Sequence, residues 1–109
     1  MSNIATMLSE DVERLLDVPR GKLMSKCRED YIVQGRWIIF EYLNQVKGWD
    51  YKQICYAFKK HRTTVLYAMN QSRDRLEADP HYSNRYTVLM NYLINKYGSN
   101  SNWIVNEYV

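Results

Sequence analysis

The segment from 29 to 47 constrains the fold most, because its apolar residues cover more than one side of a helix. One helical line through this segment is formed by Ile32, Arg36, Ile39 and Leu43. Four further residues widen the line: Trp37, Ile38, Phe40 and Val46. A helix with so broad a face has to be buried by several neighbours, so we expect it at the centre of a helical domain. Gly48 is a suitable residue to end it.

Helices are also predicted on either side of this central segment. Helical spacing of apolar residues places them at 3–17, 20–26, 63–78 and 84–97. Their expected inner residues are Val12, Leu15, Leu16, Leu23, Met24, Val65, Ala68, Met69, Ser72, Leu76, Tyr86, Leu89, Met90, Leu93 and Ile94. The predicted fold class is all-α, a compact domain of about five to six helices over residues 1–97. A tail at 98–109 follows, with an apolar run at Trp103, Ile104 and Val105.

Composition and motifs exclude several classes of function. The chain has 109 residues, which is one domain, and it carries no phosphate-binding GxxxxGK[ST] motif. No apolar stretch reaches the roughly 18–20 residues of a membrane span, and no secretory signal is visible at the start. Two cysteines, Cys27 and Cys55, are expected to be reduced thiols, and the two histidines do not pair with them at zinc-finger spacing. We therefore expect a cytoplasmic protein without a metal or another cofactor.

Positive charge is concentrated in the middle of the chain. Residues 47–75 hold seven Lys and Arg against two acidic residues, a net of +5, whereas the segments before and after each have a net of −1. Such a basic region in a near-neutral protein is typical of a protein that binds a polyanion. The alternative is a solvated basic face without a partner.

Residues 50–78 have the spacing of a helix-turn-helix. Asp50 and Gln53 are placed to form a capping box at the start of a short helix, whose buried face is Ile54, Ala57 and Phe58. A four-residue break, 59–62, precedes a longer helix that Thr63 can cap. In a helix-turn-helix, the first turn of the second helix enters the major groove of DNA. The alternative is a basic loop that caps a helix in an ordinary bundle.

The residues of this turn have the chemistry that DNA binding requires. An Arg such as Arg62 can donate two hydrogen bonds to guanine, and the Thr63 and Thr64 methyl groups can pack on a thymine methyl. The N-terminus of a helix also offers N–H groups and a positive dipole end to phosphate. The candidate DNA-contacting residues are Arg28, Arg36, Lys52, Lys59, Lys60, His61, Arg62, Thr63, Thr64 and Tyr67.

Several motifs in order resemble a known family. The run 63–68, Thr-Thr-Val-Leu-Tyr-Ala, is similar to the Thr-Thr-Val-Leu-His-Ala run that opens the recognition helix in the C-terminal domain of the bacterial replication initiator DnaA. The run 23–28, Leu-Met-Ser-Lys-Cys-Arg, is similar to the family's Leu-Leu-Ser-Lys-x-Arg segment, and Ile54 and Phe58 fit its Ile-Gly-x-x-Phe pattern. The resemblance covers about residues 12–93 and includes no ATPase domain.

The resemblance implies a monomeric domain that reads a short DNA box. It implies a minor-groove contact for Arg28, a phosphate contact for Arg36, and major-groove contacts for Thr63 and Thr64. The family has Gly-Gly-Arg-Asp-His before its Thr pair, whereas this chain has Lys-Lys-His-Arg, which is one residue shorter and lacks the acidic residue that can accept from cytosine. We therefore expect a changed target, or weaker base specificity with stronger phosphate binding.

Other side chains are assigned to structural roles. The ten tyrosines are expected to be half-buried rings with surface hydroxyls, although Tyr51 and Tyr67 flank the DNA-facing turn. The pairs Asp11 with Glu13 and Glu29 with Asp30 are interpreted as exposed charge. His61 lacks a carboxylate nearby in sequence, and no nucleophile motif accompanies it, so we expect no enzyme activity.

The preferred hypothesis is a double-stranded DNA-binding protein in replication or transcription control, associated with the nucleoid of a bacterium or serving a phage. The alternative is a protein-interaction adaptor that keeps the fold and has lost DNA binding. Its partner would bind the tail at 98–109 or the acidic N-terminal helix. A monomer is favoured by the family, and a dimer formed through the tail stays open.

Overall fold

All the regular secondary structure in the described part of the chain is helical. The structure is a computed structural model that describes residues 4–23 and 29–98, and within these ranges it contains no strand. Its elements are α1 (Ile4–Leu16), α2 (Asp30–Glu41), the π-helical turn η1 (Tyr42–Val46), α3 (Tyr51–Phe58), α4 (Arg62–Ala78) and α5 (Pro80–Tyr97). The all-α fold class is confirmed. Residues 20–23 form turns, so the described part of the helix predicted at 20–26 is not helical. Met24, Cys27, Arg28 and residues 99–109 lie outside the described residues.

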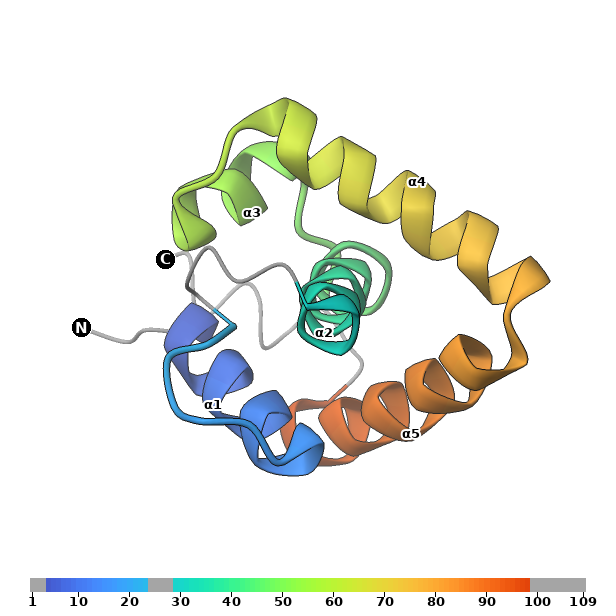
Figure 1. The fold of residues 1–109 in the computed structure, drawn as a ribbon. Helices are drawn as coiled ribbons and strands as arrows, with labels where there is room; N and C mark the ends of the chain where they lie inside the picture. Colours follow the sequence, from blue (N-terminus) through green and yellow to red (C-terminus); the bar gives the residue numbers. More distant parts are fainter. Residues whose placement is uncertain (1–3, 24–28, 99–109) are drawn as a thin grey trace.

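Helix α2 lies at the centre of the domain. In Figure 1 it is seen nearly end-on, with α1, α3, α4 and α5 arranged around it. Its buried residues occupy all sides, as expected from the breadth of its apolar pattern: Ile32, Gln34, Gly35, Trp37, Ile38, Ile39, Phe40 and Glu41. The chain continues directly into η1, and Gly48 takes a positive φ of 79° just after it. The central helix and its glycine stop are therefore confirmed.

Helix α1 packs against α2 at a glycine. A Cβ added to Gly35 would lie 3.1 Å from Leu16 Cδ1 and 3.3 Å from Val12 Cγ1, so only glycine fits without displacing these side chains. The buried line of α1 runs through Leu8 and Val12 to Leu16 at intervals of four residues. Leu15 lies off this line and is 44% exposed, so its predicted inward position was wrong.

Helices α4 and α5 meet at Asp79. The Asp79 side chain accepts hydrogen bonds from the N–H groups of His81 and Tyr82, and Pro80 occupies the first turn of α5. This cap starts α5 at residue 80, four residues before the predicted start of the last helix. Farther along, Ser72 of α4 and Tyr82 of α5 form a buried hydroxyl pair at 2.6 Å. The predicted inner residues of both helices pack in the core.

Two acidic side chains of α1 are buried, contrary to the sequence-based expectation of exposed charge. Asp11 is 3% exposed and accepts from Arg14, Lys96 and Tyr97, which ties α1 to α5. Glu13 is 2% exposed and accepts from the N–H of Leu23 at 2.8 Å. Two tyrosine rings, Tyr42 and Tyr82, are also fully buried rather than half-buried. Polar contacts therefore join α1, the 17–23 segment and α5 inside the domain.

None of the described helices combines the length and the apolar composition that crossing a lipid bilayer requires.

Candidate nucleic-acid interface

The start of α3 is fixed by a reciprocal cap. The Asp50 carboxylate accepts from the Gln53 N–H at 2.8 Å, and the Gln53 side chain accepts from the Asp50 N–H at 2.8 Å. The predicted capping box is therefore confirmed. Ile54 and Phe58 then face the core, where the Phe58 ring packs edge-on against Phe40. These contacts anchor α3 with its opposite side in solvent.

The turn between α3 and α4 is one residue shorter than predicted. Helix α3 ends at Phe58, and its C-cap residue Lys59 adopts the left-handed conformation with a φ of 56°. The Lys60 N–H donates to the Cys55 carbonyl at 3.0 Å. Helix α4 already begins at Arg62, so Thr63 lies inside the helix and the expectation that it caps α4 was wrong. His61 occupies the N-cap position, and its side chain makes no capping hydrogen bond. Only three residues, 59–61, connect the helices.

The first turn of α4 faces solvent with its polar side chains. His61, Arg62, Thr63 and Thr64 are all exposed. The first N–H groups of a helix have no partner within the helix, and the side chain at the N-cap supplies none here. The backbone and the side chains therefore offer hydrogen-bond donors on the same end of α4, where the helix dipole is positive.

A stripe of exposed residues continues along α4. Tyr67 is 63% exposed and follows Thr63 by four positions and Thr64 by three, which places the three on one helix face. Asn70 is exposed and extends the stripe by another turn, although it is not among the DNA-contacting residues predicted from the sequence. The sequence feature that could have identified Asn70 is its spacing of three positions from Tyr67. The opposite face of α4 is buried through Val65, Ala68, Met69 and Ser72.

A cavity lies where the N-terminal ends of α3 and α4 meet. Its volume is about 500 Å³, and its lining residues are Asp50, Tyr51, Lys52, Cys55, Lys60, His61 and Arg62. Four of the ten candidate DNA-contacting residues, at 52, 60, 61 and 62, therefore line one surface. Three side chains of this lining are cationic and one, Asp50, is acidic and engaged in the cap. The arrangement can hold a phosphate group beside the first turn of α4.

Two candidate DNA-contacting arginines, Arg28 and Arg36, lie outside the turn between α3 and α4. The Arg36 Nε donates to the carbonyl of Leu23 at 2.6 Å and Nη2 donates to that of Lys22 at 3.4 Å, so this side chain holds the 20–23 turn against α2. It does not line the cavity, and its phosphate contact stays a prediction. Arg28 lies outside the described residues.

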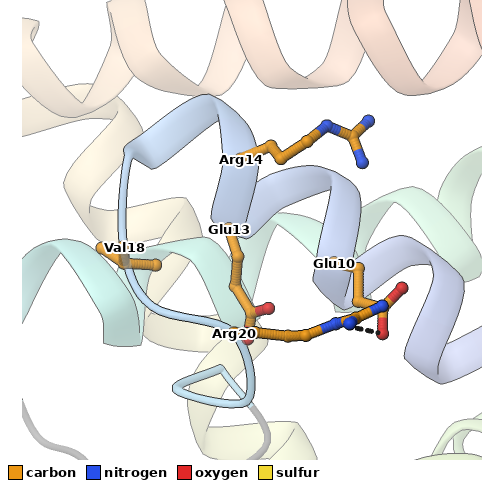
Figure 2. Close-up of a pocket in the computed structure, with 5 residues that line it drawn as sticks. All are labelled: Glu10, Glu13, Arg14, Val18 and Arg20. Carbon is orange, nitrogen blue, oxygen red and sulfur yellow. Dashed lines mark hydrogen bonds and ion pairs between the residues drawn. The ribbon is translucent and has the colours of Figure 1, made fainter.

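A second cavity, of about 290 Å³, lies between α1 and the segment that follows it. Figure 2 shows Arg20 reaching along this cavity to Glu10, with which it forms an ion pair at 3.1 Å, while Arg14 points elsewhere. Two acidic and two basic side chains line it together with Val18. Because these charges balance, the cavity lacks the cationic excess of the one between α3 and α4. No group of three or more potential metal ligands occurs in the described ranges.

Comparison of the chain with protein-family models, curated proteins and solved structures gives no match. The likeness to the initiator family therefore rests on the sequence motifs alone.

Proposed function

We propose that this protein binds double-stranded DNA through the turn between α3 and α4. The first turn of α4 would enter the major groove, and α3 would lie across the phosphate backbone. The observation that carries the proposal is the cationic cavity with Lys52, Lys60 and Arg62 at the uncapped N-terminus of α4. DNA phosphates supply the negative charge that such a surface attracts.

The proposed binding divides between phosphate and base contacts. Lys52, Lys59 and Lys60 are suited to phosphate, because an ammonium group is a compact charge without a fixed donor geometry. Arg62 and the exposed Thr63 and Thr64 are suited to base edges, since they stand on the first turn of α4. Phosphate contacts position the protein, and the few base contacts set its sequence preference.

The biological role that fits this chemistry is control of replication or transcription at specific DNA sites. The motifs that resemble the initiator's C-terminal domain support a box-reading protein of a bacterium or a phage. The missing acidic residue before the Thr pair, with Arg62 in that region, supports a target different from the initiator box. A DNA-bound protein of this kind would be associated with the nucleoid and would need no catalysis of its own.

The test is fluorescence anisotropy with three labelled duplexes of equal length at two salt concentrations. One duplex carries the initiator box, one a scrambled box, and one is a random AT-rich sequence. We expect binding that weakens steeply with salt, because bound cations release counterions from the DNA. Selective binding to the box supports an initiator-like reader, and equal binding to all three supports a changed target. No binding to any duplex at low salt would contradict the proposal and favour the adaptor.

A further inference from the structure

The most exposed ring in the described part of the chain is on the outer side of α3. Tyr56 is 88% exposed, more than any of the other exposed large hydrophobic residues, Met7, Leu15, Tyr67 and Val88. Lys52 precedes it by four positions and Lys59 follows it by three, and both lysines are exposed. The spacing of four within α3 places Lys52 on the same side of the helix as Tyr56, whereas Lys59 is the C-cap residue just beyond the end of α3. Tyr56 is therefore an exposed ring with one cation before it on the helix and a second at the C-terminal end of the helix.

A cavity of about 560 Å³ adjoins this ring. Its apolar wall is formed by Trp49, Tyr56 and Ala57, and its polar rim by Asp50, Lys52 and Gln53. The Gln53 Oε1 accepts from the Asp50 N–H, which leaves the amide Nε2 of Gln53 available as a donor. Asp50 and Lys52 also line the cationic cavity, so the two cavities are neighbours on either side of α3.

The combination of an exposed ring, flanking cations and an adjoining cavity fits one class of ligand. The flat face of a nucleobase stacks on an aromatic ring, and lysines beside the ring bind the phosphates on either side of that base. A base within a duplex has both faces covered by its neighbours, so this contact requires an unpaired strand. An apolar protein partner would use the ring but would leave Lys52 and Lys59 without counter-charges.

We propose that the outer face of α3 binds single-stranded DNA, with a base stacked on Tyr56 beside the Trp49 cavity and the flanking phosphates at Lys52 and Lys59. The Tyr56 ring and the Trp49 cavity take no part in the proposed duplex binding, although Lys52 and Lys59 are shared by the two surfaces. The inference therefore goes beyond the proposed duplex binding and does not require it.

The test measures the affinity for a labelled single-stranded 12-mer of thymidine by fluorescence anisotropy at low salt. Replacing Tyr56 by Ala removes the ring and should weaken binding by about five- to 150-fold, the range that stacking of one base on an aromatic residue supplies. Tyr56→Phe keeps the ring and should bind like the natural protein. Val88→Ala shortens an exposed apolar side chain of α5, outside both proposed DNA-binding surfaces, and is the control, because it should leave single-strand binding unchanged.

The Tyr56→Ala substitution should leave the fold and its stability unchanged. Tyr56 makes little contact with the core, so far-UV circular dichroism and Tm should be the same for Tyr56→Ala and the natural protein. Duplex binding by Tyr56→Ala should also be unchanged, which separates failure of this inference from failure of the proposed duplex function. The inference is overturned if the natural protein does not bind the 12-mer, or if Tyr56→Ala binds it as tightly as Tyr56→Phe.

Discussion

Asp50 and Gln53 exchange two hydrogen bonds of 2.8 Å, each side chain accepting from the backbone N–H of the other residue. Both residues line the cavity beside Tyr56, and Asp50 also lines the cationic cavity at the start of α4. This cap therefore fixes the helix on which both proposed DNA-binding surfaces depend.

Loss of the cap should destabilise the domain. Asp50→Ala leaves the Gln53 N–H without its side-chain partner, and we expect the free energy of unfolding to fall by about 0.5–2 kcal/mol. Asp50→Ser retains an acceptor at the N-cap and is the matched control, with a loss of only a few tenths of a kcal/mol expected. Chemical denaturation measures both values. Equal stability of Asp50→Ala and the natural protein would show that the cap contributes nothing.

The Asp11 carboxylate should make the domain sensitive to acid. Burial by itself would raise the pKa of Asp11, but hydrogen bonds from Tyr97, Lys96 and Arg14 outweigh it and lower the pKa below its usual 3.8. A lowered pKa stabilises the fold at pH values above the unfolded pKa, and this stabilisation is lost as the pH falls through the folded pKa. Below about pH 4, chemical denaturation of the natural protein should therefore show a fall in the free energy of unfolding that Asp11→Asn lacks.

The Asp11→Asn variant should also be less stable at neutral pH. It gives up charge-assisted hydrogen bonds at a side chain that is almost fully buried, which costs roughly 1.5–3 kcal/mol. If the variant showed the same acid-dependent loss as the natural protein, the loss would have to come from another carboxylate.

Glu41 should produce the opposite pH dependence. This buried side chain has a raised pKa because burial disfavours its charged form, and the charge of Arg73 and the hydrogen bond from Gln45 do not fully compensate. When the pKa of a carboxyl is higher in the folded than in the unfolded state, the free energy of unfolding falls as the pH rises from the usual pKa of 4.5 towards the folded pKa.

The matched variant for this effect is Glu41→Gln, which keeps the size of the side chain and removes the charge. Its free energy of unfolding should lack the decline that the natural protein shows, so the variant should gain stability relative to the natural protein as the pH rises above 4.5. A variant that tracks the natural protein across this window would disprove the assignment to Glu41.

Lys59 allows charge and backbone strain to be separated. Lys59 adopts the left-handed conformation, which is unfavourable by roughly 1–2 kcal/mol for a residue that has a Cβ atom. Glycine has no Cβ and avoids this cost. Lys59→Gly should therefore be more stable than Lys59→Ala by about 1 kcal/mol in denaturation. Both variants lose the same charge, so each should reduce the slope of log affinity for duplex DNA against log salt by about 0.9. Different slopes for the two variants would contradict a purely electrostatic role.

The helices were predictable from the sequence because their signals are local. The breadth of apolar residues in 29–47 placed α2 at the centre, and the capping residues Asp50 and Gln53 located the start of α3 correctly. The end of α4 at residue 78 agrees with the predicted range 63–78, whereas α5 begins four residues before the predicted range 84–97.

The errors concern interactions that the local sequence does not contain. Asp11 is buried because Lys96 and Tyr97 reach it from the other end of the chain, 85 and 86 residues away. The shorter turn depends on Lys59 adopting the left-handed conformation, which is usual for glycine. Because the turn contains no glycine, the sequence does not predict its length. The high exposure of Tyr56 was not predicted either, because an aromatic ring usually packs at least partly against the core.

The central claim is that the turn between α3 and α4 binds duplex DNA, and charge reversal tests it most directly. The double variant Lys60→Glu, Arg62→Glu reverses two cations of the cavity, and Arg20→Glu reverses an exposed cation that lines the other cavity. In anisotropy titrations at low salt, we predict that the double variant loses about 100-fold or more in affinity, because it gives up a base contact and a phosphate contact. Arg20→Glu should bind like the natural protein. Duplex binding by the folded double variant at natural affinity would contradict the account.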